Sequence, residues 1–235
     1  MIPLLVFTSD KYLPALRPFA YLFNRYWSAA QTVTVVGFAE PEFELPSNFQ
    51  FHSLGDVRHY PINHWSNAVM DYLEVRTDIS HFIFMLEDYW VTRPVNISAI
   101  KMLYDYALQF RNVLKIDTGT DRLYAGGMKD YNHCGYLDLV LSDYNSPYHM
   151  SLMAGIFNKE LLLRFMLRNE SPWDLEIYGT SRLATARDEV LVLGTRNFPL
   201  RHTLAHRGGD IGKTNTSELD PFDVDALTHL GYLPY

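Results

Sequence analysis

The chain has 235 residues, 48% hydrophobic and 20% charged, a composition that suits a globular core and excludes a disordered or fibrous protein. Its formal net charge of −7 disfavours nucleic acid as a partner, and any anionic ligand must meet a local site. The one cysteine, Cys134, cannot form an intramolecular disulfide, and no apolar run reaches the length of a membrane span. We therefore expect a cytoplasmic protein with no membrane span.

The first 120 residues alternate between apolar runs and amphipathic stretches. Residues 2–8 predict a buried strand that ends in a polar turn, a helical repeat follows at 13–27, and the β-branched run 32–38 predicts a second strand. The same alternation then predicts a strand at 49–54, a helix from 65 with Asn63 as candidate cap, a strand at 81–86, a helix around 100–108 and a strand at 113–116. Such repeats predict an α/β fold with a central, mostly parallel sheet flanked by helices.

The second half of the chain differs in composition. Residues 117–147 are rich in Gly, Asp, Tyr and Asn and predict loops around a cleft, with one strand candidate at 137–141. Beyond them we expect strands at 149–157 and 190–193, a helix at 159–167 after Asn158, a helix that begins at Ser171 and Pro172, a polar tail at 202–216 and a short helix at 224–230. No linker interrupts the chain, so we expect a single domain over 1–235.

Two acidic residues, Glu87 and Asp88, directly follow the most strand-like run, 81–86. Ligands of open α/β sheets bind outside the carboxyl ends of the strands, and Mg²⁺ or Mn²⁺ prefers carboxylate oxygen and commonly bridges protein acids to a diphosphate. The pair therefore predicts a cation site through which an acidic protein binds an anionic nucleotide. The alternative is that both acids cap the following turn and are solvated.

Three segments, in their order along the chain, resemble the GT-A class of nucleotide-sugar glycosyltransferases. They are FTSDKYLPALRPFAYLFNRYW followed by TVTVVGF, then FIFMLEDYWVTRPVN, and then YHMSLMAGIFNKELLLRFMLRNESPWDLEIYGTSR. The resemblance spans roughly residues 1–210 and implies a GT-A (Rossmann-like) fold. It implies a nucleotide-sugar-binding half at 1–120, an acceptor-side half at 121–215 and a C-terminal tail at 216–235. The second segment departs from a strict Asp-x-Asp motif because Tyr89 occupies the third position.

The resemblance also implies roles for individual residues. Glu87 and Asp88 would hold Mn²⁺ or Mg²⁺ on the diphosphate of a nucleotide-sugar donor, and a late histidine, His206 in preference to His202, would join them. The remaining donor contacts would come from the turn Thr8, Ser9 and Asp10 and from the basic stretch that includes Arg207 and Lys213. Ordinary turn polarity and a solvated loop are the alternatives for these two segments.

The segment Ser171 to Glu176 supplies two candidates for a catalytic base. An inverting transferase needs a carboxylate that takes the proton of the acceptor hydroxyl. Glu176 is preferred because Asp174 is placed to serve as the capping-box acid of the helix that starts at Ser171. A retaining mechanism, which would not use such a base, stays open.

These inferences predict a metal-dependent, inverting, hexosyltransferase-like enzyme that moves a sugar from a nucleotide-diphosphate donor to a hydroxyl-bearing acceptor of unknown type. One alternative is a nucleotidyltransferase that makes a sugar nucleotide, although the turn after the first strand lacks the glycine such enzymes usually have. The other is a non-catalytic carbohydrate-binding protein of the same fold, which the tyrosine at position 89 favours. Three tryptophans, Trp65, Trp90 and Trp173, are candidates for stacking on a sugar ring.

Overall fold

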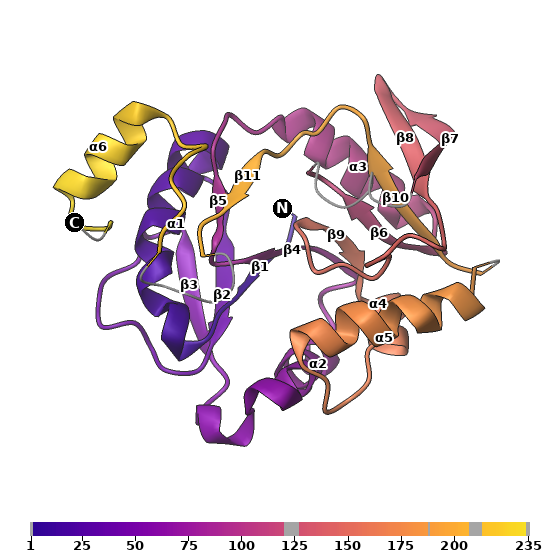
Figure 1. Cartoon of the computed structure of the whole chain (residues 1–235), viewed down its shortest axis with the longest axis horizontal. Helices are drawn as coiled ribbons and strands as arrows, with labels where there is room; N and C mark the ends of the chain where they lie inside the picture. The colour runs from indigo at the N-terminus through magenta and orange to yellow at the C-terminus, as the bar shows by residue number, and fades with distance from the viewer. Residues whose placement is uncertain (1, 120–126, 188, 207–212, 234–235) are drawn as a thin grey trace.

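The computed structural model describes residues 2–119, 127–187, 189–206 and 213–233. Within them a nine-stranded sheet has the order β3-β2-β1-β4-β9-β6-β10-β8-β7 (Figure 1). Its strands are β1 (Leu4–Phe7), β2 (Val33–Gly37), β3 (Phe49–Ser53), β4 (His81–Leu86), β6 (Val113–Asp117), β7 (Met128–Cys134), β8 (Leu137–Ser142), β9 (Gly155–Asn158) and β10 (Leu191–Thr195). A second sheet pairs β5 (Tyr89–Val91) with β11 (His202–Leu204).

The large sheet is mostly parallel. Strands β3, β2, β1 and β4 pair in parallel, as do β6 and β10, whereas β9 is antiparallel to both of its neighbours and β8 is antiparallel to both of its own. All strands of this sheet except β8 and β9 therefore point in one direction. The carboxyl ends of β1, β2, β4 and β6 meet at one edge, which is the edge where α/β proteins place ligands.

Helices cover both faces of the sheet, because successive residues of a buried strand point to opposite sides. On one face Val6, Ile83 and Met85 pack with α1 (Leu16–Phe23) and α3 (Ile97–Gln109). On the other, Phe7, Phe82 and Phe84 pack with α2 (Trp65–Val75), α4 (Lys159–Phe165) and α5 (Pro172–Thr185), which lie together at the bottom of Figure 1. The predicted fold class is confirmed: a mixed α/β, Rossmann-like arrangement with a large, mostly parallel central sheet flanked by helices.

Local capping signals explain where several helices begin. Asn96 and Asn158 accept hydrogen bonds from Ala99 N (3.0 Å) and Leu161 N (3.1 Å) at the starts of α3 and α4. The last helix, α6 (Pro221–His229), starts at the cap Asp220. The prediction that Asn63 caps α2 is wrong: Asn63 lies inside a short 3₁₀ turn, Ile62–His64, and His64 precedes the helix without a side-chain cap bond.

Other predicted elements differ in extent. The expected strand at 149–157 is only β9, because the backbone of residues 151–152 hydrogen-bonds to side chains of β6 and α5 instead of to a neighbouring strand. The stretch predicted as a helix at 13–27 is 3₁₀ from Asp10 to Ala15, α from Leu16 to Phe23 and π from Asn24 to Ser28. The short strands β5, β7 and β11 were not predicted.

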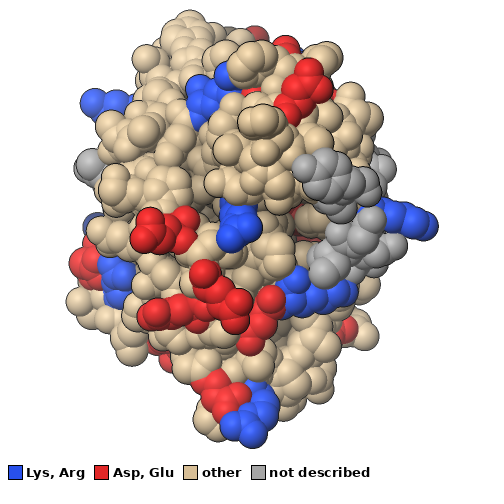
Figure 2. Space-filling view, turned by 90° about the vertical axis from the view of Figure 1, so that its left-hand side faces the viewer, with Lys and Arg blue, Asp and Glu red and all other residues tan. Residues whose placement is uncertain are grey.

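Two surface properties follow from the described residues. None of their helices has both the length and the apolar character needed to cross a bilayer. On the face that carries α1 and α6, acidic and basic side chains lie interspersed, so no single sign of charge dominates that face (Figure 2).

Candidate active site

The two acids predicted to hold a cation lie at the carboxyl end of the central strand β4. Glu87 is 5% exposed and Asp88 is half-buried. Burial raises the pKa of Glu87 well above its usual value, and the neighbouring Asp88 raises it further. Burial raises the pKa of Asp88 to about 6. The physical cause of both pKa shifts is the burial of two adjacent carboxyl groups, neither of which has an ion-pair partner among the described residues.

The chemistry of this pair fits a divalent cation shared with a substrate. No Lys or Arg among the described residues forms an ion pair with either acid. Within the same residues no cluster of three or more His, Cys, Asp or Glu could hold a metal ion by itself. Mg²⁺ is usually bound through one or two carboxylates, with substrate phosphates and waters completing the shell. Glu87 and Asp88 provide that number of carboxylates.

His206 is brought to this edge by the small β5–β11 sheet. Thr203 pairs with Trp90, and the sheet is extended by a hydrogen bond of 2.8 Å from Ala205 N to the carbonyl of Asp88. His206 is the next residue, and its ring lies 5.8 Å from the ring of Trp90. The fold therefore brings the three residues predicted as metal ligands, Glu87, Asp88 and His206, to one end of the sheet. Glu87 and His206 are 119 positions apart in the sequence.

A residue that the sequence did not single out, Tyr12, lies at the same place. Its ring centre is 6.1 Å from that of His206, and burial together with Asp88 and Glu87 raises the pKa of its hydroxyl. Tyr12, Trp90 and His206 line a cavity of about 270 Å³. The buried indole nitrogen of Trp90 has no hydrogen-bond partner among the described residues. The only sequence signal for Tyr12 is its position just after the first strand.

The turn Thr8-Ser9-Asp10 lies at this edge as predicted, but its groups are used in the fold. The carboxylate of Asp10 accepts a hydrogen bond of 2.9 Å from Ala39 N, which ties the end of β1 to the loop after β2. Thr8 is buried, and its amide donates to the carbonyl of Val36 (2.9 Å). Its methyl group packs so closely on Gly37 that a Cβ there would lie 2.7 Å away. Contact of this turn with a nucleotide stays a prediction.

The structure separates the two candidate bases. Asp174 completes a capping box, accepting hydrogen bonds from the amide (3.1 Å) and the hydroxyl (2.6 Å) of Ser171, which lower the pKa of its carboxyl group. Glu176 is 8% exposed and accepts a hydrogen bond of 2.9 Å from Leu152 N. The carbonyl of Leu152 in turn accepts one of 3.2 Å from the hydroxyl of Tyr89. Glu176 is thus linked through one backbone residue to the neighbour of Asp88.

A buried lysine fixes the segment that makes this link. Lys115 of β6 is 1% exposed, forms an ion pair with Asp117, and donates hydrogen bonds to the carbonyl (2.9 Å) and hydroxyl (3.1 Å) of Ser151. A Cβ at Gly155 would lie 2.7 Å from Lys115 Cε, so the lysine side chain fills the space that the glycine leaves. The sequence does contain a signal for this buried lysine, because Lys115 stands inside the apolar run VLKID. No role was predicted for it from the sequence alone.

Among the described residues, the structure does not bring the predicted basic residues and tryptophans together in one site. Arg207 lies outside the described residues, and Lys213 is exposed. Among the three tryptophans, Trp90 is buried, Trp65 is half-buried and Trp173 is 62% exposed on α5.

No family model matches the chain, and no curated protein matches its sequence. Among solved structures, the galactosyltransferase LgtC in complex with donor and acceptor sugar analogues is 14% identical, with 69% of this chain and 60% of that chain covered and a TM-score of 0.40. Apo UDP-glucose pyrophosphorylase is 10% identical, with 86% and 92% covered and a TM-score of 0.47. The chain thus spans 60% of the length of the galactosyltransferase.

Proposed function

We propose that this chain is a metal-dependent glycosyltransferase that moves a sugar from a nucleotide-diphosphate donor to a hydroxyl acceptor. The observation that carries the proposal is the pair Glu87 and Asp88, adjacent, raised in pKa by burial and placed at the carboxyl end of the central strand. Two such carboxyl groups are costly to ionise together. A divalent cation bound to a diphosphate would offset the cost of ionising both carboxyl groups, and this would explain why two acids are buried side by side.

Each residue near the pair has a part in donor binding. Asp88, with Glu87, holds Mn²⁺ or Mg²⁺, and His206, predicted as a third ligand, lies at the same end of the sheet next to the hydrogen bond from Ala205 N to the carbonyl of Asp88. The cation supplies charge stabilisation for the departing diphosphate. The remaining donor contacts are assigned to the turn Thr8, Ser9 and Asp10 and to the basic residues Arg207 and Lys213.

The residue that we assign to the acceptor, Glu176, lies on α5. We assign Glu176 as the base that takes the proton of the acceptor hydroxyl in an inverting reaction. The capping box supports this choice over Asp174, because the carboxylate of Asp174 already accepts two hydrogen bonds from Ser171, the N-cap of its own helix. The hydrogen bond to Leu152 holds one oxygen of Glu176 in place.

The test measures release of nucleotide from a panel of UDP-, GDP- and ADP-sugars, with and without Mn²⁺. We expect release that requires Mn²⁺ and that Asp88→Asn lowers by about 100-fold or more, in line with the loss of a group that stabilises charge in the transition state. Asp105→Asn, at an exposed position of α3, is the matched control and should keep the wild-type rate. Circular dichroism of both variants checks that the fold survives.

Three outcomes contradict the proposal. Release that is the same in Asp88→Asn as in Asp105→Asn removes the assignment of the cation site. Formation of nucleoside triphosphate when pyrophosphate is added with the sugar nucleotide identifies a nucleotidyltransferase instead. A protein that releases no nucleotide under any condition is a binding protein of the same fold.

A further inference from the structure

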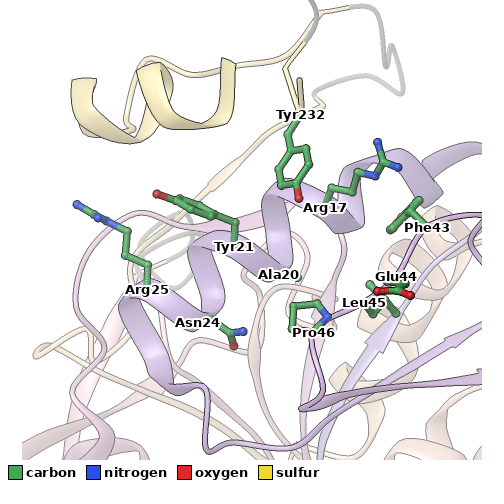
Figure 3. Close-up of a pocket in the computed structure, with 10 residues that line it drawn as sticks. All are labelled: Arg17, Ala20, Tyr21, Asn24, Arg25, Phe43, Glu44, Leu45, Pro46 and Tyr232. Atoms are coloured by element: carbon green, nitrogen blue, oxygen red, sulfur yellow. The ribbon is translucent and has the colours of Figure 1, made fainter. Parts of the chain in front are cut away.

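A second, larger cavity lies away from the two acids, on the outward side of α1. Its volume is about 560 Å³. One wall is a stripe of α1 and the residues after it, the opposite wall is the segment 43–46, and Tyr232 from the C-terminal segment closes the top (Figure 3). Neither Glu87, Asp88 nor Glu176 lines this cavity. Three separate parts of the chain therefore form a site that the proposed reaction does not use.

Aromatic rings and one arginine dominate the chemistry of this cavity. The guanidinium carbon of Arg17 lies 4.4 Å from the ring centre of Phe43 and 5.8 Å from that of Tyr232. Stacking on the two rings restrains the guanidinium plane. Among the described residues no hydrogen bond or ion pair uses Arg17, so its N–H groups can donate to a ligand. The ring of Tyr21, further along α1, adds a third aromatic surface (Figure 3).

The charge on the walls is balanced. Arg25 also lines the cavity, but its Nε is paired with Asp223 at 2.8 Å. The exposed carboxylate of Glu44 lies on the opposite wall from Arg17. The whole face carries both signs of charge interspersed (Figure 2). A nucleotide diphosphate or another strongly anionic ligand would need several unpaired cations, and this cavity presents one, opposed by a carboxylate.

We propose that this cavity binds a neutral saccharide, apart from the candidate active site and without need of cation or donor. The C–H faces of a sugar ring pack on aromatic side chains, and its hydroxyl groups both donate and accept hydrogen bonds. Phe43, Tyr21 and Tyr232 provide the faces, Arg17 the donor and Glu44 the acceptor. Tyr232 also lines the smaller cavity that contains Tyr12 and His206. The two cavities are therefore separated by the side chain of Tyr232.

The experiment uses the full chain in buffer that contains EDTA. A glycan array with neutral, sialylated and sulfated oligosaccharides identifies the strongest bound glycan, and titration calorimetry with that glycan compares variants. We expect a neutral oligosaccharide, with Kd raised about tenfold or more by Phe43→Ala and several-fold by Arg17→Gln. The matched controls are Tyr178→Ala for an exposed aromatic ring on α5 and Arg164→Gln for an exposed arginine on α4, and both should leave Kd unchanged.

The outcomes separate this inference from the proposed function. Asp88→Asn should bind the glycan as the wild type does, so a failure of the transferase proposal leaves the saccharide site standing. The inference is overturned if no neutral glycan binds, if only sulfated or sialylated glycans bind, or if Tyr178→Ala weakens binding while Phe43→Ala does not. Arg17 is exposed, so Arg17→Gln provides a variant whose folding is not at risk if Phe43→Ala proves unstable.

Discussion

Leu152 N donates a hydrogen bond of 2.9 Å to the carboxylate of Glu176. Because the carbonyl of Leu152 also accepts a hydrogen bond from Tyr89, this one residue joins helix α5 to the strand that follows Asp88. A carboxyl group held in this way has a fixed position relative to the two acids. A transfer reaction requires that the groups acting on the donor and the group acting on the acceptor are held at fixed positions relative to each other.

Replacing Glu176 by Gln should stop the transfer of sugar to an acceptor without loss of the fold. The amide oxygen of Gln can still accept the bond from Leu152, but the side chain cannot take a proton at neutral pH. We expect transfer to fall by about 10²- to 10⁴-fold, with the Kd of the donor unchanged. Donor binding is measured by calorimetry and transfer by product formation.

Asp174→Asn is the matched variant two positions away on the same helix. It weakens the capping box, so we expect the midpoint of urea unfolding to move to a lower urea concentration while transfer stays at the wild-type rate. Should Asp174→Asn abolish transfer and Glu176→Gln preserve it, the base would be Asp174.

Lys115→Met should destabilise the protein through its buried neighbours. It removes the ion pair of Lys115 with Asp117 and the hydrogen bond of Lys115 to the carbonyl of Ser151. Breaking one partner of a buried pair costs about 3–5 kcal/mol. Urea unfolding should show this loss, and the double variant Lys115→Met with Asp117→Leu should recover part of it. A single variant as stable as the wild type would contradict the role given to the lysine.

His149 should make stability depend on pH. Burial lowers its pKa from the usual 6.5 to about 4, with Lys115 also acting to lower it and Asp143 to raise it; its ring contacts Ser142 at 3.0 Å. Between these two pH values the unfolded chain binds a proton at this histidine and the folded chain does not. The contribution of His149 to the free energy of unfolding is therefore fully present above about pH 6.5. It decreases by on the order of 3 kcal/mol as pH falls towards 4.

The measurement for His149 is the difference between wild type and His149→Gln in urea unfolding from pH 4 to 7. A difference is needed because Asp88, whose pKa is raised, contributes the opposite slope. The stability of wild type should fall relative to that of His149→Gln as pH falls from 6.5 towards 4. Parallel curves would show that folding does not lower the pKa of His149.

Asp223 should decide whether α6 stays docked. Its side chain is 0% exposed, pairs with Arg25 at 2.8 Å and accepts a hydrogen bond from the hydroxyl of Tyr26. Asp223→Ala leaves both partners without their acceptor, and we expect faster amide hydrogen exchange in α6 and a loss of about 3 kcal/mol in stability. Asp225→Ala, on the same helix, is the control and should change neither.

Local patterns in the sequence determined the α/β class, the central strand His81–Leu86 with its two acids, and the start of α5 at Ser171. Each depends on neighbours within four positions, where alternation, helical spacing and capping act directly. Only the tertiary structure decided that β9 runs antiparallel, that β11 pairs with β5 and places His206 beside Asp88, and that Glu176 and Lys115 meet at residues 151–152. These contacts join residues tens to more than a hundred positions apart, and their formation depends on the packing of the whole sheet rather than on any local preference.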